Sequence, residues 1–493
     1  MAAEEKKYTK SNKNKAGFTS VWLVMILSSL MFLLLVITEA ASGFVCGSIC
    51  ENACVSAGQS VLSEFDTALY ENYGVLALRS NDTKIADMAS YYIGSSIAAE
   101  GCLVNPKLKK CTVLTESYPG LGTELFEAQI KALGVQSGIY SLAGENSLIQ
   151  AFSGLLEASE YADTLDSSSI NGLQTMMNDC SDEADDLLDE ASDLKDALSE
   201  MKASEDYDEE AARAVSDDIK KLENKADKAQ KEADLCGNLI RKYNSAVDPD
   251  FGSDEEGCCI SEELAAELPS GMLEIPATLS LLLSGGITEP DPDAIPCGEY
   301  ILNNCSNCQN RHENTFLKAE AEYILYGHNG EADNISALKR SLFSIRFPLN
   351  LKSVYADPQK MAEYHASAAA FLPVPVSLTV FVLASIDASA QSLNDIELIC
   401  SGHKVPFVKG GNGGDYSDYL RILLLCLPQD IKMVRLMDIM QMNLSEKQGK
   451  AFAFRDYCYG FSLSAEFEKN LKVSVIDVPS IRTGKISIQL QYK

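Results

Sequence analysis

The stretch Phe18–Thr38, FTSVWLVMILSSLMFLLLVIT, contains no charged residue and decides how the rest of the chain is arranged. As an α-helix rising about 1.5 Å per residue, it would span roughly 31 Å, close to the hydrocarbon thickness of a bilayer. A secretory signal usually has an apolar core of about 7–15 residues, followed by small residues at its cleavage site. Residues 40–43, AASG, offer such small residues, so signal cleavage stays an alternative. The length of the apolar core favours a retained transmembrane helix.

The charges on either side of this stretch give its direction. Residues 1–17 carry five lysines and two glutamates, whereas the whole chain has 41 basic and 71 acidic residues and a net charge of −30. Basic segments are retained on the cytoplasmic side, so we expect a cytoplasmic basic arm at 1–17 and a single-pass anchor in the cell membrane. The lipid bilayer would contact residues 18–38, and the body after them would be extracytoplasmic. Its acidity excludes nucleic acid as a partner, because the phosphate backbone would be repelled.

Residues 39–165 predict a membrane-proximal region of mixed helix and strand. Apolar residues recur at helical spacing through 39–79, and Gly74 marks a break. Residues 109–118, KKCTVLTESY, alternate in the manner of a strand. One face of the first helix carries three cysteines four residues apart: Cys46, Cys50 and Cys54. They would either pack as small apolar residues or pair with a neighbouring molecule.

Residues 170–246 predict an antiparallel coiled-coil hairpin. The segment contains two apolar heptad seams. In an antiparallel hairpin centred near Asp208, the numbers of facing residues sum to about 416, as for Leu194 and Leu222. The same register places Cys180 opposite Cys236. These two cysteines would form a disulfide or pack as free thiols, and the sequence leaves both alternatives open. An intermolecular coiled coil would need a continuous seam through 203–210, where the apolar register is poor.

Residues 247–312 predict a cysteine-rich loop region. It holds five cysteines that could form disulfides in an extracytoplasmic protein: Cys258, Cys259, Cys297, Cys305 and Cys308. With His312, the last three give C-x7-C-x2-C-x3-H, which supplies zinc ligands but only one of the two paired knuckles of a structural site. Disulfides are therefore favoured over zinc and over free thiols, and we expect no metal site.

Residues 313–493 predict a helical globular domain that ends in β-strands. Residues 371–386 are apolar, but a run of 16 residues with two early prolines indicates a buried core helix rather than a second span. Alternation of apolar and polar residues in three final segments indicates an antiparallel sheet or hairpin: 460–467, 472–477 and 485–492. The fold class is therefore mainly α with a small β portion (α+β).

The sequence offers no set of catalytic residues. It has no H-E-x-x-H and no G-x-S-x-G, and the glycine-rich residues 410–415 lack the lysine and serine that end a phosphate-binding loop. We therefore expect no enzymatic activity and no cofactor. A membrane-tethered enzyme is the weakest of the functional alternatives.

Several stretches carry a resemblance to a known family: KAGFT at 15–19, Glu39 after the apolar helix, and SVLSEFDTALYENYGVLAL at 60–78. Residues 322–327, 338–347 and 418–424 extend it. The sequence resembles a family of unknown function in Gram-positive bacteria whose genes accompany Tad (tight adherence, Flp-type) pilus systems. The resemblance implies a TadE/TadG-like, pseudopilin-like membrane protein with other Tad pilus components as partners.

The resemblance also implies a prepilin-type processing site between Gly17 and Phe18. The fifth residue after such a cut would be Trp22, where type IV pilins have glutamate, so the sequence departs from the pilin pattern there. The functional alternative to an assembly component is a cell-surface adhesin or interaction protein that uses the coiled-coil hairpin as its binding arm.

Overall fold

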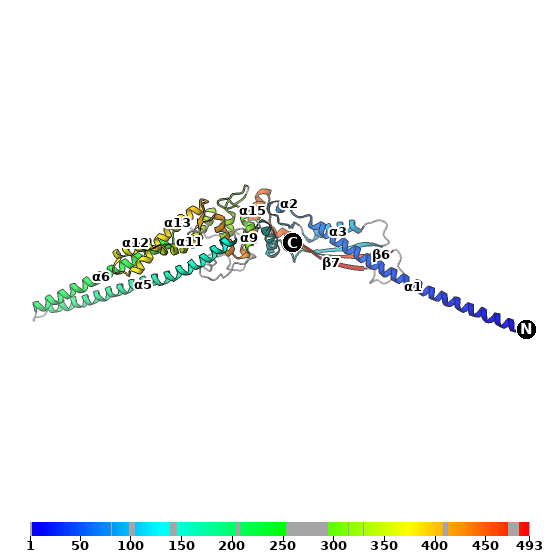
Figure 1. Ribbon diagram of the computed structural model, residues 1–493, viewed down its shortest axis with the longest axis horizontal. Helices are drawn as coiled ribbons and strands as arrows, with labels where there is room; N and C mark the ends of the chain where they lie inside the picture. The colour runs from blue at the N-terminus through cyan, green and yellow to red at the C-terminus, as the bar shows by residue number, and fades with distance from the viewer. Residues whose placement is uncertain are drawn as a thin grey trace. The chain divides into compact units, whose positions relative to one another are not determined.

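The computed structural model describes residues 2–79, 81–97, 104–138, 145–203, 208–252, 294–313, 315–328, 330–407, 413–471 and 483–492 (Figure 1). The described residues are mainly helical with a few antiparallel strands, which confirms the α+β class. The chain divides into two compact units. Unit 1 comprises Met1–Gln129 and Leu444–Lys493, and unit 2 comprises Ile130–Asn443.

Unit 1 combines one very long helix with an antiparallel sheet. Its sheet has the strand order β2-β6-β7, and two further short strands pair with each other. The elements are α1 (Ala2–Leu62), α2 (Thr67–Tyr73), β1 (Leu78–Arg79), α3 (Asp82–Ile97), β2 (Val104–Leu114), the start of α4 (Thr123–Gly138), the 3-10 turn η3 (Phe454–Asp456), β5 (Tyr457–Cys458), β6 (Gly460–Leu471) and β7 (Thr483–Gln491).

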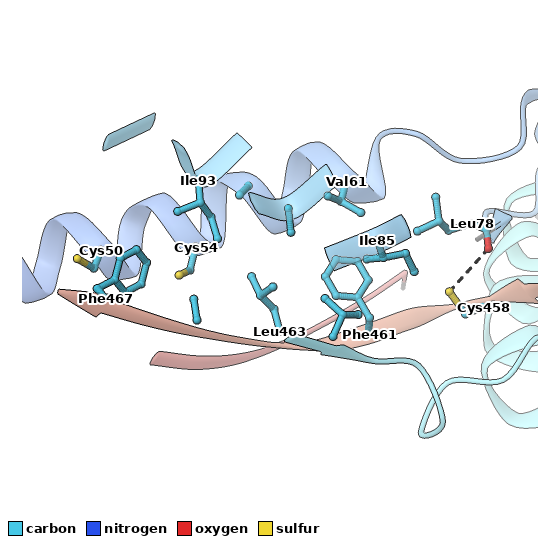
Figure 2. Packing of buried hydrophobic residues seen from close by; sticks show 14 of the residues in the cluster. Cys50, Cys54, Val61, Leu78, Ile85, Ile93, Cys458, Phe461, Leu463 and Phe467 are labelled. Atoms are coloured by element: carbon cyan, nitrogen blue, oxygen red, sulfur yellow. Dashed lines mark hydrogen bonds between the residues drawn. The ribbon is translucent and has the colours of Figure 1, made fainter. Parts of the chain in front are cut away.

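The core of unit 1 lies between the sheet and the helices α1 and α3 (Figure 2). Helix α1 contributes a stripe of small or β-branched residues at spacings of three and four: Cys46, Cys50, Cys54, Ala57 and Val61. Strand β6 contributes alternate residues, among them Phe461, Leu463 and Phe467, as a half-buried strand requires. Cys46, Cys50 and Cys54 are all buried in this core, as the packing alternative requires.

The end of α1 is fixed by contacts with the C-terminal segment. The hydroxyl of Tyr492 donates to the carbonyl of Leu62 (2.6 Å), and that of Tyr457 donates to Asp66 Oδ2 (2.7 Å). Asp66 also caps α2 by accepting from the amide of Leu69. Gly74 ends α2 at φ 71°, which confirms the predicted break.

The unit boundaries differ from the predicted domains. The predicted globular domain 313–493 is divided after Asn443, because its last strands lie in unit 1 with the N-terminal region. Strand β6 pairs with β2, more than 300 residues earlier, so that Leu463 faces Val113. Alternation predicts a strand but not the strand beside it. Of the predicted strand segments, 472–477 lies outside the described residues.

Unit 2 is helical. It contains α5 (Glu145–Ala203), α6 (Glu209–Val247), α9 (Ala294–Asn304), α10 (Glu320–Tyr326), α11 (Glu331–Tyr355), α12 (Pro358–Ala368), the 3-10 turn η2 (Ala369–Phe371), α13 (Val376–Cys400), β3 (Val405–Pro406), β4 (Gly413–Gly414), α14 (Tyr416–Cys426) and most of α15 (Gln429–Gln448). The apolar segment after residue 371 forms α13, and half of its most apolar window is buried, as the core-helix prediction requires.

Helices α5 and α6 form the predicted antiparallel hairpin. Lys195 Nζ lies 2.6 Å from Glu223 Oε1, close to the predicted register. Asp208 caps the start of α6 by accepting from the amides of Glu210 and Ala211. The distal part of the hairpin has its own apolar cluster, formed by Ala191, Leu194, Leu198, Ala212, Val215, Ile219 and Leu222. Helix α5 starts at residue 145 rather than near 170, so the hairpin grows out of a longer helix than its heptads indicate.

Candidate functional site

The first candidate site is the apolar segment of α1. Its large side chains are exposed all round the helix between Val21 and Ile37, with Trp22 at 62% and Phe32 at 57%. The hydroxyls in this segment donate to carbonyls of the preceding turn: Ser28 to Met25, Ser29 to Ile26, and Thr38 to Leu34, at 2.8–2.9 Å. Polar side chains that are satisfied within the helix are compatible with hydrocarbon surroundings.

Helix α1 passes from this exposed segment to the core without a break. Phe44 is 82% exposed, whereas Cys46 is fully buried against the sheet side of unit 1. Thr38 and Cys46 are eight residues apart, which is about 12 Å along a helix. The apolar segment and the folded part of unit 1 are therefore joined by about two turns of the same helix.

Among the described residues, two helices are long and apolar enough to cross a membrane, and only the N-terminal one, Thr19–Leu62, has its apolar window wholly exposed. Length and composition suit a membrane span and a signal sequence equally. Gly17 and Phe18 lie on helical backbone within α1. Processing between them stays a prediction.

The hairpin cysteines lie near each other, as the register predicts. Next to them, Met177 Sδ is 3.5 Å from the position that a Cβ on Gly237 would occupy. Burial raises the pKa of the Cys236 thiol, and the neighbouring Cys180 raises it further. Both residues are free thiols in the structure, so the disulfide between them stays a prediction.

The cysteines of the predicted loop region are separated. Cys258 and Cys259 lie outside the described residues. Cys297 is buried within helix α9, which replaces part of the predicted loop, and Cys305 is buried just after its end. Cys308 is half-buried. In the described part of the chain no three His, Cys, Asp or Glu side chains converge to hold a metal, so the zinc alternative with His312 finds no support there.

A buried cluster of polar side chains around α10 was not anticipated from the sequence. Glu320 and Glu322 are 1% and 0% exposed. Glu320 accepts from the amide of Ser306 (2.7 Å) and from Asn443 Nδ2 (2.5 Å). Glu322 accepts from the amide of Cys308 (2.9 Å) and from the hydroxyl of Tyr416. Burial raises the pKa of both carboxyls, because it disfavours their charged forms.

Helix α15 holds the other end of α10. Arg435 Nη1 donates to the carbonyls of Ile324 (3.0 Å) and Leu325 (2.6 Å), and Tyr323 donates to Asp438 Oδ2 (2.5 Å). The chain leaves α10 through Gly327 at φ 74°, where a Cβ would lie 2.8 Å from Arg435 Cζ. Glycine is therefore required for its backbone conformation and for the close approach of the guanidinium.

Ion pairs also join the helices of unit 2, and two of them are largely buried. Arg346 on α11 donates to Asp395 Oδ2 on α13 at 2.9 and 2.6 Å, and Arg421 on α14 donates to Glu299 Oε1 on α9 at 2.6 Å. The hydrogen bonds around α10 likewise join side chains to backbone groups of loops and helix ends. Such an arrangement positions a loop.

The sequence carried only a weak signal for this cluster. Glu320 and Glu322 are two residues apart, a spacing that places them on different faces of a helix. One of them would normally be assigned to solvent. Both are buried because α10 has only two turns and is covered on both sides, by the loop after α9 and by α14 and α15.

No curated protein and no solved structure matches the chain. The helices α9 to α14, which contain the buried polar cluster, lie within residues 284–469 together with α15 and most of β6. Residues 284–412 and 409–469 match the model of a family of unknown function, DUF5702.

Proposed function

We propose that the chain is a non-enzymatic, single-pass membrane protein whose N-terminus is cytoplasmic and whose body is extracytoplasmic. The observation that supports this most directly is the continuity of α1. Its exposed apolar segment and its core-forming segment belong to one unbroken helix, Ala2–Leu62. A bilayer would cover the apolar side chains that the protein leaves bare.

We further propose that the protein is a component of a Tad-like pilus or secretion apparatus. The resemblance of residues 15–19 and 60–78 supports this role. The helix–sheet packing adds a physical reason, because the stripe from Cys46 to Val61 fixes the folded body to the anchor. A contact made by the body is then transmitted to the membrane helix, as an assembly component requires.

The N-terminus of the mature protein tests the anchor. The intact mass of the protein purified from membranes should show a chain that still includes residues 18–38. A chain that starts at Phe18 would indicate prepilin-type processing and would still contain the anchor. A chain that starts at residues 41–44 would overturn the anchor, because signal cleavage would have removed it.

Protease treatment of intact cells tests the orientation. An N-terminal epitope tag should stay protected, whereas the body should be digested from outside. Protection of the body in intact cells, with digestion after lysis, would contradict the extracytoplasmic placement. Deletion of the gene should abolish pilus assembly, and normal pili after deletion would contradict the assembly role.

A second candidate function, an adhesin, is favoured by the distal half of the hairpin. Its apolar cluster contains only residues of α5 and α6 among the described residues, so this half folds as a separate arm. Removing two heptads from each helix, 187–200 and 216–229, preserves the register and shortens the arm by about 21 Å. Normal pili with lost attachment would favour the adhesin. Unchanged attachment would contradict it.

A further inference from the structure

The loop after α9 meets the end of α13 at two half-buried cysteines, Cys308 and Cys400. The side-chain amide of Gln309 donates to the carbonyl of Ile399 (2.8 Å). These two residues immediately follow Cys308 and precede Cys400. Gly402 continues the contact, because a Cβ there would lie 3.4 Å from Gln309 Oε1. The Gln309 side chain therefore links the two segments that carry the cysteines.

A second set of contacts converges on the same place. Glu322 Oε1 accepts from the amide of Cys308 and from the hydroxyl of Tyr416. Burial raises the pKa of Tyr416, and Glu322, Cys308 and Cys400 raise it further. Burial also raises the pKa of the Cys400 thiol to about 11, and Cys308 adds to this shift. Both thiols therefore act on the pKa of the same phenol, and Cys308 acts on that of Cys400.

We propose that Cys308 and Cys400 form a disulfide bond when the chain is in an oxidising compartment. The inference rests on the proposed extracytoplasmic placement for its occurrence in the cell, and on the contacts of Gln309 and Glu322 for the choice of partners. It differs from the expectation that Cys308 pairs within the loop region. The described cysteines of that region, Cys297 and Cys305, are 0% and 1% exposed.

The bond forms by thiol–disulfide exchange with an oxidant that is itself a protein or small-molecule disulfide. The Cys308 thiolate attacks one sulfur of that disulfide and releases the other as a thiolate. Cys400, after losing its proton, attacks Cys308 and releases the second oxidant thiolate. The chain loses two protons and two electrons, and the oxidant is reduced to a dithiol. Burial raises the pKa of the Cys308 thiol and Glu322 raises it further, whereas a hydrogen bond with Tyr416 and the charge of Arg311 offset part of this rise.

The disulfide would tie the loop that caps both buried glutamates to the end of α13. The amides of Ser306 and Cys308 donate to Glu320 and Glu322, so the position of this loop determines whether these two hydrogen bonds form. Reduction would leave these hydrogen bonds in place but would remove the covalent link across the chain between residues 308 and 400.

Peptide mapping of the full-length protein tests the proposal. Cells are quenched in acid, and free thiols are alkylated. The non-reduced digest is then analysed by tandem mass spectrometry, in which backbone fragmentation between Cys305 and Cys308 shows which of the two is linked. We expect a peptide that links Cys308 to Cys400, with Cys305 recovered in alkylated form. The Cys308→Ser variant should lose the link and yield alkylated Cys400. The matched Cys305→Ser variant should retain it.

A second arm separates this inference from the proposed topology. Purified full-length protein is treated with oxidised glutathione before mapping. A link that forms only in this arm would support the pairing and contradict the extracytoplasmic placement. Two separately alkylated peptides in both arms, or a link from Cys308 to another cysteine, would overturn the proposal.

Discussion

Gly327 allows a direct measurement of how tightly α15 holds α10. In Gly327→Ala, the new Cβ would lie 2.8 Å from the Cζ and Nη2 atoms of Arg435. The alanine would also have to adopt the positive φ of 74° that the glycine has. The left-handed conformation costs a residue with a Cβ about 1–2 kcal/mol, and overpacking in a core adds about 1–3 kcal/mol. We therefore expect Gly327→Ala to destabilise unit 2 by about 2–5 kcal/mol.

Gly402→Ala is the matched control in the same unit. Its φ is 84°, but the nearest atom to an added Cβ is Gln309 Oε1 at 3.4 Å, the end of a flexible side chain. The free energy of unfolding of the control should fall only by the cost of the left-handed backbone conformation, about 1–2 kcal/mol. The difference between the two variants then measures the contact with Arg435.

Urea unfolding followed by hydrogen exchange of α10 and α15 peptides provides the free energies for unit 2 separately from unit 1. In an Arg435→Met background, Gly327→Ala should cost no more than Gly402→Ala, because the guanidinium is gone. Equal destabilisation by the two glycine variants in the wild-type background would refute the reasoning. It would mean that the Arg435 side chain moves aside without any loss of stability.

Three further predictions concern the cysteines, the buried carboxyls and the core of unit 1. A non-reduced digest of the membrane-derived protein should contain Cys180 linked to Cys236, a bond worth about 4 kcal/mol by loop entropy; two separately alkylated peptides would contradict it. Burial raises the folded-state pKa of Glu322 above its unfolded value of 4.5, so the folded protein binds this proton more tightly than the unfolded chain does. The resulting stabilisation is fully present below pH 4.5 and is lost as the pH rises through the folded-state pKa. The urea midpoint of unit 2 should therefore fall over that interval, and less so in Glu322→Gln. Phe461→Ala should destabilise unit 1 by about 3–5 kcal/mol, whereas Tyr91→Ala, at a side chain 72% exposed, should change it by less than about 0.5 kcal/mol; similar midpoints for both in a thermal melt would show that the β6 core is not tightly packed.

Periodic segments were predictable because their signal is local. The heptads of residues 170–246 gave both helices of the hairpin and their antiparallel register, which the Lys195–Glu223 ion pair supports. The start of α5 at Glu145 was not predicted, because the heptads begin only near residue 170, although the helix runs through Gly154 and Gly172. A single glycine weakens a helix by about 1 kcal/mol and need not end it.

Long-range pairing and burial were not predictable from the same patterns. Strand β6 alternates clearly, yet its partner β2 lies more than 300 residues earlier, and no local residue indicates which strand it will join. The sequence EAEYILYG at 320–327 has the appearance of a surface helix with two acidic residues. Its glutamates are buried among distant groups that donate hydrogen bonds to them: the amides of Ser306 and Cys308 and the side chains of Asn443 and Tyr416.

The continuity of α1 has a geometric consequence for the proposed anchor. The stripe of Cys46, Cys50 and Cys54 fixes the rotation of the helix about its own axis, because these small side chains allow a close approach to the sheet. A Cβ on Gly58 would overlap Leu490 of β7, so the helix cannot turn away without losing this contact. Each residue turns the helix by about 100°, and the same face therefore recurs every three to four residues into the apolar segment. A partner that binds the body of unit 1 would thus meet one defined face of the membrane helix. With a flexible linker between the anchor and the body, the face of the membrane helix would not be fixed relative to the body.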